Sequence, residues 1–534
     1  MKTTHQHNAP HSGRRTAVYG QHGMVATTQP LAAQAGLDTL KAGGNAIDAA
    51  IATAAALTVV EPTSNGIGGD AFALVYVNGD VHGLNGSGRS PSMLTKEALD
   101  ARGLSSIPPH GVLPITVPGA PSAWVALAKR FGNLPLSKSL EPAIRYAEEG
   151  YPVSPVVAAY WHAAYTAYKH RFVGEVYQPW FDTFAPNGHP PHVGDLVTLP
   201  GHATTLKAIA ETDGEAFYRG DIADQIDALM QAHDGLLRRE DLASHEAIWV
   251  DPMRVRYRGY DVYELPPNTQ GIIALQSLAI LERMHQDGKV GFHERIEAIK
   301  RASSDAFNHV ADAASMHIKP EALLDKTVIE SHVASIGVQA ADVDDFTPPR
   351  GGTVYLSTAD NQGNLVSFIQ SNYMGFGSGV VVPGTGIALQ NRAHNFNAQA
   401  GHPNVYGPRK RTYHTIIPGM FVKPDDTVCA FGVMGGFMQP QGHIQVLARL
   451  IDDGEDPQSA LDGPRWFWEQ GRRLYVEDDM PAAVLKTLKE HGHDVVIDTG
   501  RARYGRGQII LRDLKTGVCV GGTEKRADGH VAVW

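Results

Sequence analysis

A threonine that directly follows two glycines is the residue in this sequence with the clearest capacity for chemistry. Gly351 and Gly352 precede Thr353, and glycine permits backbone conformations that residues with a Cβ resist. If the bond between Gly352 and Thr353 were cut, Thr353 would carry both a hydroxyl nucleophile and a free α-amine. Such an amine titrates at about 7.7 to 8.0, so it can accept the hydroxyl proton without a separate histidine. The alternative is an ordinary glycine turn before a buried strand.

The residues on the C-terminal side of Thr353 predict a β-hairpin that would position it. Residues 353–360 alternate between two faces, as a strand does. The turn formers DNQGN follow at 360–364, and residues 365–371 are rich in β-branched and aromatic side chains. Ser371 ends this return strand and is among the candidate substrate-binding residues.

A glycine pair at a predicted strand-to-helix junction is the second motif with chemical potential. Residues 428–433 predict a strand, Gly435 and Gly436 follow it, and residues 439–450 predict a helix. Two successive glycine N–H groups at such a junction can form an oxyanion hole. A packing turn is the alternative interpretation.

These motifs together resemble the γ-glutamyltransferase (γ-glutamyltranspeptidase) family of N-terminal-nucleophile hydrolases. The small subunit of that family begins with a threonine and a strand, followed by a D-x-x-G-N turn, a return strand and an F-G-T/S-G loop. Here these elements are Thr353, Asp360, Gly363, Asn364 and the FGSG loop at 376–379. The other matching stretches are GMVA at 23–26, GGNAIDAA at 43–50, IGGDAF at 67–72, PNVYG at 403–407, GVMGG at 432–436, GPRW at 463–466 and KRADG at 525–529. The resemblance covers about residues 22–534.

The resemblance implies an α+β fold, the four-layer α-β-β-α sandwich of these hydrolases, made as one proenzyme that cuts itself between Gly352 and Thr353. We therefore expect a flexible tail at 1–21, a large subunit at 22–352 and a small subunit at 353–534. The two subunits would stay associated, with a dimer of such heterodimers as one possible assembly. Thr353 would be the nucleophile, its amine the base and then the acid, and Gly435 and Gly436 the oxyanion hole. The resemblance implies no metal and no organic cofactor.

Two substrate-binding positions of the family are matched only in part. The family has an arginine for the substrate carboxylate just after an early strand pair, and Arg89 is the candidate here, with a solvated loop arginine as the alternative. The family's Ser-Ser pair after Lys-Arg appears as His414 and Thr415. We therefore expect Arg89, His414 and Thr415 to bind the substrate.

The positions that hold the glutamyl α-ammonium differ more strongly. Transpeptidases use an Asn, a Gln and an Asp, whereas the matching residues here are Tyr373, Arg392 and Asn395. Losing a carboxylate and gaining a guanidinium makes the pocket less favourable for an ammonium and more favourable for an anion or a neutral group. The alternative is that Arg392 points away and pairs structurally.

Three functions remain open at this level. The stretch that carries a lid loop in many transpeptidases is nearly absent after Gly407, which favours hydrolysis or acylase activity. The first hypothesis is a γ-glutamyl hydrolase or transferase that acts on glutathione-like compounds. The second is an acylase or amidohydrolase for another carboxylate-bearing acyl group, such as glutaryl. An uncleaved binding homologue is disfavoured because Thr353, Gly435 and Gly436 are intact.

Composition limits the partners and the location. The 534 residues carry a formal charge of −10, which argues against nucleic acid because its phosphates require a basic surface. Cys429 and Cys519 lie in apolar runs and are expected to be buried thiols rather than a disulfide. No secretory signal and no membrane-spanning apolar run is present, so we expect a cytoplasmic protein without membrane contact. The tail histidines at 5, 7 and 11 are expected to be solvated.

Helical periodicity and turn signals predict the remaining framework. A helix is expected at 31–41, and a second at 46–60 with Asn45 as its cap. Strands are expected at 71–77 and 80–84, joined by a tight turn. Residues 165–200 lack a clear period and are interpreted as a long surface excursion, with His189 and His192 as surface residues.

Overall fold

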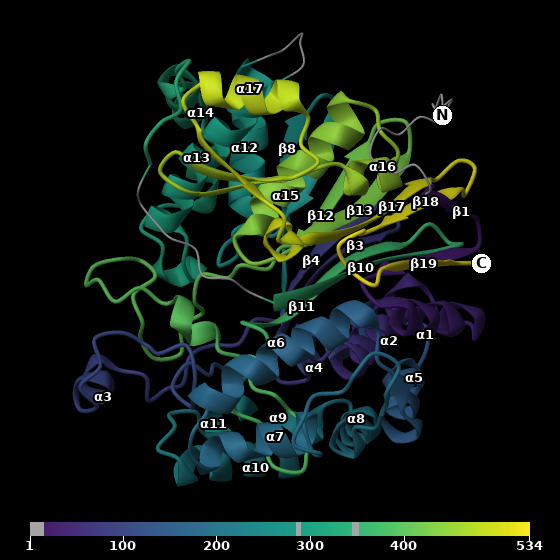
Figure 1. The fold of residues 1–534 in the computed structure, drawn as a ribbon. Helices are drawn as coiled ribbons and strands as arrows, with labels where there is room; N and C mark the ends of the chain where they lie inside the picture. Colours follow the sequence, from purple (N-terminus) through teal and green to yellow (C-terminus); the bar gives the residue numbers. More distant parts are fainter. Residues whose placement is uncertain (1–14, 285–289, 344–351) are drawn as a thin grey trace.

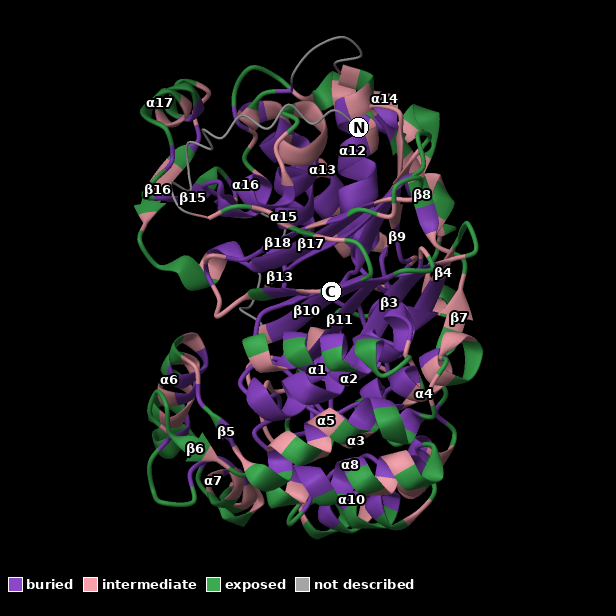
Figure 2. Ribbon diagram, turned by 90° about the vertical axis from the view of Figure 1, so that its right-hand side faces the viewer, coloured by how far each residue is buried: buried purple, intermediate pink, exposed green. Residues whose placement is uncertain are grey.

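Two seven-stranded sheets packed face to face form the centre of the structure (Figure 2). The computed structural model describes residues 15–284, 290–343 and 352–534. The sheet that we call the β13 sheet contains, in spatial order, β1 (Val18–Gly20), β18 (Cys519–Thr523), β17 (Arg506–Asp513), β13 (Thr427–Met434), β12 (Gly419–Lys423), β9 (Tyr260–Glu264) and β8 (Met253–Tyr257). The other, the β10 sheet, contains β19 (His530–Val533), β2 (Gly23–Thr27), β10 (Gly352–Asp360), β11 (Leu365–Tyr373), β3 (Asp70–Val77), β4 (Asp80–Asn85) and β7 (Ile248–Val250).

The predicted hairpin is confirmed as β10 and β11, and it lies in the middle of its sheet. Successive side chains of a strand point to opposite faces. Val354 and Leu356 therefore join the core beneath the sheet, whereas Tyr355 packs into the core between the two sheets. The alternation read from the sequence thus corresponds to two cores, one on each side of the strand.

A layer of helices covers the outer face of the β10 sheet, at the bottom of Figure 1. Its longest buried member is α2, all of whose residues are buried, and Asn45 and Asp48 form a capping box at its start as the sequence predicted for Asn45. This side of the molecule contains α1 (Pro30–Lys41), α2 (Ala46–Val60), α3 (Lys96–Asp100), α4 (Ala120–Phe131), α5 (Leu136–Glu149), α6 (Pro155–Arg171), α7 (Gln178–Phe184), α8 (Pro200–Thr212), α9 (Glu215–Tyr218), α10 (Asp221–Ala232), α11 (Arg239–Ala243) and the short pair β5 (Tyr151–Pro152) and β6 (Leu196–Val197).

A second layer covers the outer face of the β13 sheet, at the top of Figure 1. It contains α12 (Gly271–Met284), α13 (Phe292–His309), α14 (Lys326–Ser335), α15 (Met438–Leu447), α16 (Pro457–Asp462), α17 (Ala482–Glu490) and the small sheet β14 (Trp466–Gln470), β15 (Arg473–Glu477) and β16 (Asp494–Asp498). The order of layers is therefore α-β-β-α, which confirms the expected α+β sandwich.

The N-terminal tail is shorter than predicted. Val18–Gly20 forms β1, an edge strand of the β13 sheet that pairs with β18, and Arg15 donates a hydrogen bond to Asp462 at 2.9 Å. The prediction that the tail reaches residue 21 was wrong because three residues suffice to extend an existing sheet edge. Residues 1–14, with their three histidines, lie outside the described residues.

The interpretation of residues 165–200 as a surface excursion was also wrong in its first half. Helices α6 and α7 bury Trp161, Trp180 and Phe184, and the Phe376 ring of the FGSG loop lies 5.1 Å from Trp180 and 4.7 Å from Phe184 between centroids. Aromatic side chains on several faces of α6 obscure its helical period. This segment therefore supports the loop that follows the hairpin.

Smaller predictions are confirmed. Cys429 and Cys519 are buried free thiols. His189 and His192 lie at the surface. The predicted C-terminal helix at 439–450 corresponds to α15 followed by a π-helical turn at Ala448–Asp452.

Candidate active site

The start of β10 buries Thr353 against the end of β11. Thr353 is 1% exposed, and its hydroxyl donates to the Ser371 hydroxyl at 3.2 Å. The Ser371 hydroxyl donates in turn to the carbonyl oxygen of Gly352 at 2.7 Å. A single side chain, that of Ser371, thus connects the candidate nucleophile with the carbonyl of the peptide bond that it would attack.

An irregularity in the ladder produces this contact. Gly352 pairs with Tyr373, but Val354 pairs with Gln370, so β11 contains one residue more than β10 at this point. Tyr373 has a φ of +77°, a left-handed conformation that non-glycine residues seldom adopt. Bulges of this kind re-aim side chains next to active sites. Here the Ser371 hydroxyl, at the bulge, donates to the Gly352 carbonyl and accepts a hydrogen bond from the Tyr373 N–H at 2.8 Å.

Arg392 contacts the hydroxyl of Ser371, to which Thr353 is also bonded, and its role in substrate binding stays a prediction. Its guanidinium donates to the Thr415 hydroxyl at 2.8 Å and to the Ser371 hydroxyl at 3.3 Å. It also lies 4.4 Å from the centroid of the Tyr373 ring, at cation–π distance. Burial lowers the pKa of Arg392 to about 10, so it stays charged at neutral pH.

A buried carboxylate and imidazole stand next to this guanidinium. Asp70 begins β3, directly opposite Ser371 in the ladder, and its Oδ2 lies 3.0 Å from Nε2 of His414, with both side chains fully buried. The N–H of Ile416 donates to Nδ1 of His414, so Nε2 carries the proton that is donated to Asp70.

The charges of this pair are set by burial and by Arg392. Burial raises the pKa of Asp70 to about 7, although the guanidinium of Arg392 opposes the shift. Burial and Arg392 together lower the pKa of His414 well below its usual value, so the imidazole is neutral. Asp70 was missed at the sequence level, where the only signal was an acidic residue in an otherwise apolar strand after a glycine loop.

The glycine pair lies at the end of β13, where α15 begins. Gly435 and Gly436 have φ angles of +134° and +61°, and their carbonyls accept bonds from the first turn of the helix. Within the described part of the chain, neither N–H donates a hydrogen bond. The side chain of Gln270 donates to the carbonyls of both Gly436 and Thr415, which ties the pair to the Arg392 group.

Two predicted substrate residues have other partners. The Asn395 amide donates to the backbone carbonyl of Tyr413 at 3.2 Å. Arg89 forms an ion pair with Asp312 at 2.8 Å on a half-exposed side chain, and it makes no hydrogen bond to the described residues around Thr353. Its role as the acyl-carboxylate ligand stays a prediction, and the structure places a different guanidinium, that of Arg392, beside the nucleophile.

Several polar groups beside the nucleophile are buried without a partner among the described residues. These are the hydroxyl of Tyr373, both amide atoms of Asn372 and Nε of Arg392. Buried polar groups in folded proteins are nearly always paired, and a lone one costs about 1–3 kcal/mol. A concentration of them next to Thr353 is typical of a binding site.

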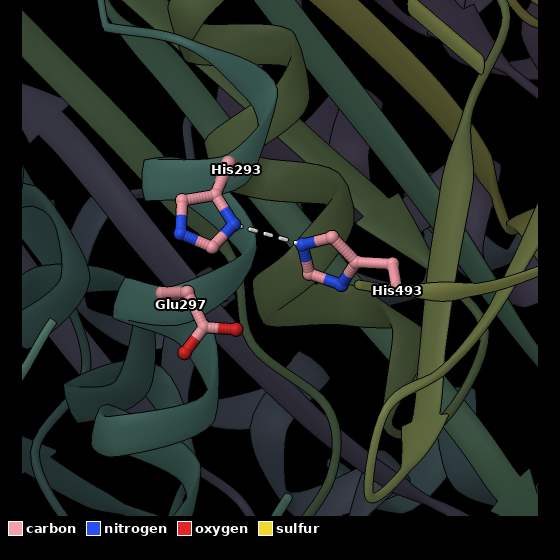
Figure 3. A group of neighbouring side chains, drawn as sticks. All are labelled: His293, Glu297 and His493. Carbon is pink, nitrogen blue, oxygen red and sulfur yellow. Dashed lines mark hydrogen bonds between the residues drawn. The ribbon is translucent and has the colours of Figure 1, made fainter. Parts of the chain in front are cut away.

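A separate group of His293, Glu297 and His493 lies in the outer helical layer (Figure 3). One ligand atom from each lies within 4.8 Å of the others, and Nδ1 of His293 lies 3.0 Å from Nε2 of His493. Two imidazoles and a carboxylate are ligands that a transition-metal ion accepts. The sequence gave no sign of this group because the two histidines are 200 residues apart.

The carboxylate of this group is already paired. Glu297 forms ion pairs with Lys300 at 2.8 Å and with Arg301 at 2.5 Å. His293 also contacts the carbonyl of Gly337, and Lys300 donates to that of Ala341. We therefore assign the group a structural role: its hydrogen bonds hold residues 337–341 against the helices.

Comparison with known proteins agrees with this geometry. A family model described as Gamma-glutamyltranspeptidase matches residues 32–534. The chain belongs to the gamma-glutamyltranspeptidase family. A relative in Bacillus subtilis (strain 168), the glutathione hydrolase-like YwrD proenzyme, is 36% identical over 96% of this chain and 98% of its own length. The oxamate amidohydrolase proenzyme of Klebsiella pneumoniae is 34% identical over the same shares.

A crystal structure has the same fold as this chain over almost the whole length of both proteins. The crystal structure of cephalosporin acylase from Bacillus halodurans is 56% identical, has a TM-score of 0.94, and covers 98% of this chain and 97% of its own. This gamma-glutamyltranspeptidase-family chain therefore has the N-terminal-nucleophile hydrolase fold and is an enzyme. Among the helices in the described ranges, none has both the length and the apolarity needed to cross a bilayer.

Proposed function

We propose that this enzyme activates itself by cutting between Gly352 and Thr353. The Thr353 hydroxyl oxygen attacks the Gly352 carbonyl carbon, the C–N bond breaks, and the acyl group moves from nitrogen to oxygen as an ester. Water then hydrolyses the ester, which leaves a Gly352 carboxylate and a free Thr353 amine. The hydrogen bond from Ser371 to the Gly352 carbonyl supports this proposal because it polarises the bond under attack. The relatives in B. subtilis and K. pneumoniae are both named proenzymes.

The mature enzyme would then transfer or hydrolyse an acyl group by the same nucleophile. The Thr353 amine takes the hydroxyl proton while the oxygen attacks the substrate amide, and it returns the proton to the leaving amine. The N–H groups of Gly435 and Gly436, which have no acceptor among the described residues, would receive the oxyanion. Water or another amine then takes the acyl group from Thr353.

For the acyl group, we propose one with a terminal carboxylate and no α-ammonium, of the glutaryl type. The buried guanidinium of Arg392, bonded to Ser371 beside the nucleophile, carries this proposal. A unit positive charge at about 4 Å would repel an ammonium by roughly 4 kcal/mol at an effective dielectric of 20, whereas it attracts a carboxylate. The 56% identical structure is that of a cephalosporin acylase, which supports an acylase activity.

A γ-glutamyl substrate is the second candidate, and one observation favours it. Asp70 is a buried carboxylate within the same group, and a carboxylate is what an α-ammonium requires. The B. subtilis relative is named glutathione hydrolase-like. We rank it second because Asp70 is already bonded to His414 and balanced by Arg392.

The self-cleavage proposal is tested by intact-protein mass spectrometry on the wild type beside Thr353→Ala. Two fragments in the wild type, the second beginning at Thr353, and one uncut chain in the variant are expected. A wild-type chain that stays whole on long incubation would contradict self-processing.

The acyl-group proposal is tested with the processed enzyme and two chromogenic amides that differ in one group, glutaryl-p-nitroanilide and γ-glutamyl-p-nitroanilide. A kcat/KM at least tenfold higher for the glutaryl compound is expected. The opposite order would assign the site to γ-glutamyl compounds and would leave the nucleophile assignment intact.

A further inference from the structure

A cavity of about 180 Å³ lies in the helical layer that covers the outer face of the β13 sheet. Its walls come from the start of α13, the end of α15, the first residue of β14 and the first turn of α17. These elements lie on the side of the β13 sheet that faces away from β10, as Figure 2 shows. The cavity is therefore separate from the nucleophile at Thr353.

Two side chains of this cavity carry an N–H group that no described residue accepts. They are Arg295, through Nε of its guanidinium, and Trp466, through Nε1 of its indole. Arg295 is 6% exposed, and Trp466 is fully buried. Buried donors in folded proteins nearly always have an acceptor, and both of these groups can only donate. Two of them at one cavity indicate a ligand that supplies an acceptor atom.

Gln445 of α15 fixes the backbone of Trp466. Its side-chain oxygen accepts a hydrogen bond from the Trp466 backbone N–H at 2.9 Å, and its nitrogen donates to the Trp466 carbonyl at 3.0 Å. The indole is thus attached to a fixed strand end. A preformed donor of this kind reduces the conformational entropy that is lost when a ligand binds.

A π-helical turn at Ala448–Asp452 continues α15 and completes this side of the cavity. The turn carries Arg449, whose guanidinium donates to the Pro464 carbonyl at 3.2 Å. Single π-helical turns in helices are frequent at functional sites. The turn therefore adds a second, independent sign of a binding site.

The guanidiniums beside the cavity are already matched by carboxylates. Arg295 forms an ion pair with Asp452 at 3.3 Å, and Arg449 forms one with Glu455 at 3.1 Å. Asp453 adds a further negative charge to the wall. An anion would therefore lose its hydration without meeting an unmatched positive charge. The charges favour a neutral ligand.

Rings and a branched side chain form the apolar part of the walls. They belong to Phe292, Pro464, Pro481 and Val484. An apolar cavity of about 150 Å³ in another protein accommodates benzene. A cavity of about 180 Å³ therefore admits one aromatic ring with a small substituent.

We propose that this cavity binds a small neutral aromatic compound that carries a carbonyl group. The ring packs between Phe292, Pro464 and Val484. The carbonyl oxygen accepts hydrogen bonds from the N–H groups of Arg295 and Trp466. The site does not depend on which acyl group Thr353 accepts.

The test is isothermal titration of the full-length purified protein with acetophenone. Ethylbenzene, of similar size but without an oxygen, and benzoate, which is charged, are the comparison compounds. Saturable binding of acetophenone is expected, about tenfold tighter than that of either comparison compound, because only acetophenone supplies a neutral acceptor. Ethylbenzene binding as tightly as acetophenone, or benzoate binding more tightly, would overturn the proposal.

Trp466→Phe keeps an aromatic ring and removes the N–H donor. It should weaken acetophenone binding about five- to tenfold and leave ethylbenzene binding unchanged. Trp468→Phe is the matched control, because the Trp468 indole donates to the Gly471 carbonyl at 3.0 Å, and this variant should bind acetophenone as the wild type does. Equal affinities of wild type and Trp466→Phe, or equal weakening in both variants, would contradict the assigned donor.

Val484→Trp fills the cavity from α17, at a half-buried position that can admit a larger side chain. It should abolish the binding of acetophenone. Unchanged affinity in this variant would place acetophenone elsewhere, the acyl site included, and overturn the proposal. If Trp466→Phe does not fold, Val484→Trp and the comparison of the three compounds decide.

Discussion

Two groups of buried charges in this molecule differ in their partners: in one the charges contact opposite charges, and in the other they contact mainly neutral groups. In the C-terminal part of the chain, Arg526 lies between Glu477 and Glu524, and Arg465 forms a second ion pair with Glu524 at 2.8 Å. All four residues are buried. Each charge therefore has an opposite charge in direct contact, and backbone carbonyls accept further guanidinium N–H groups, although Nε of Arg465 has no partner among the described residues.

The group around Thr353 is paired much less completely. Arg392 bonds to two hydroxyls, those of Ser371 and Thr415, rather than to a carboxylate. Asp70 is a buried carboxylate whose charge interacts with Arg392, but its hydrogen bond is to the neutral His414. A buried ion is costly unless it is matched, so the first group is built for stability, and the second retains interaction energy for a ligand. The difference predicts that equivalent mutations affect stability in one place and activity in the other.

The largest effect on folding is expected from Arg526→Gln. Removing this guanidinium leaves two buried carboxylates without their main partner, which should cost about 3–5 kcal/mol of unfolding free energy. Urea denaturation followed by tryptophan fluorescence measures it. Lys515→Gln, at an exposed ion pair with Asp426, is the matched control and should leave the midpoint unchanged.

Glu524→Gln tests the same group through pH. Burial raises the pKa of Glu524, but Arg465 and Arg526 outweigh it and hold that pKa at about 2, against roughly 4.3 in an unfolded chain. The stabilisation is therefore fully present above pH 4.3 and is lost as the pH falls toward 2, and it amounts to about 3 kcal/mol. Unfolding free energies of wild type and variant should differ by a constant amount from pH 7 to 5 and converge below pH 4. A difference independent of pH down to 3 would contradict the ionised pair.

Arg392→Gln should reverse the pattern, with little change in stability and a large change in turnover. Loss of the guanidinium should lower kcat/KM for glutaryl-p-nitroanilide about 100-fold, equivalent to about 2.7 kcal/mol. Activity on γ-glutamyl-p-nitroanilide should fall much less, because that substrate carries an ammonium which the guanidinium repels. Arg392→Lys, which keeps the charge, should recover part of the loss. An equal loss on both substrates would indicate a purely structural arginine.

Ser371→Ala is expected to slow self-cleavage about 10- to 100-fold, the smallest of these effects. The variant removes the hydrogen bond to the Gly352 carbonyl but keeps Thr353. The fraction of uncut chain after expression, followed over time on a denaturing gel, measures the rate. Ser371→Thr keeps a hydroxyl and should cut at a rate close to that of the wild type.

The sequence predicted the local elements of the site well and its long-range contacts poorly. The hairpin of β10 and β11 and the helix at 46–60 follow from alternation, turn formers and a cap, which are all local signals. Asp70 was not recognised because its partner His414 is 344 residues away, and the pairing exists only when the sheet forms.

The sandwich also determines what a cut between Gly352 and Thr353 can do. Strands from the two sides of that bond alternate within both sheets: β1 pairs with β18, β9 with β12, β2 with both β19 and β10, and β3 with β11. The strands of the two products would therefore be interleaved, and separating the products would require breaking backbone hydrogen bonds between strands in both sheets. A cut at this place would free an amine without releasing a subunit, so the molecule could gain a new chain terminus at the buried Thr353 and keep its shape.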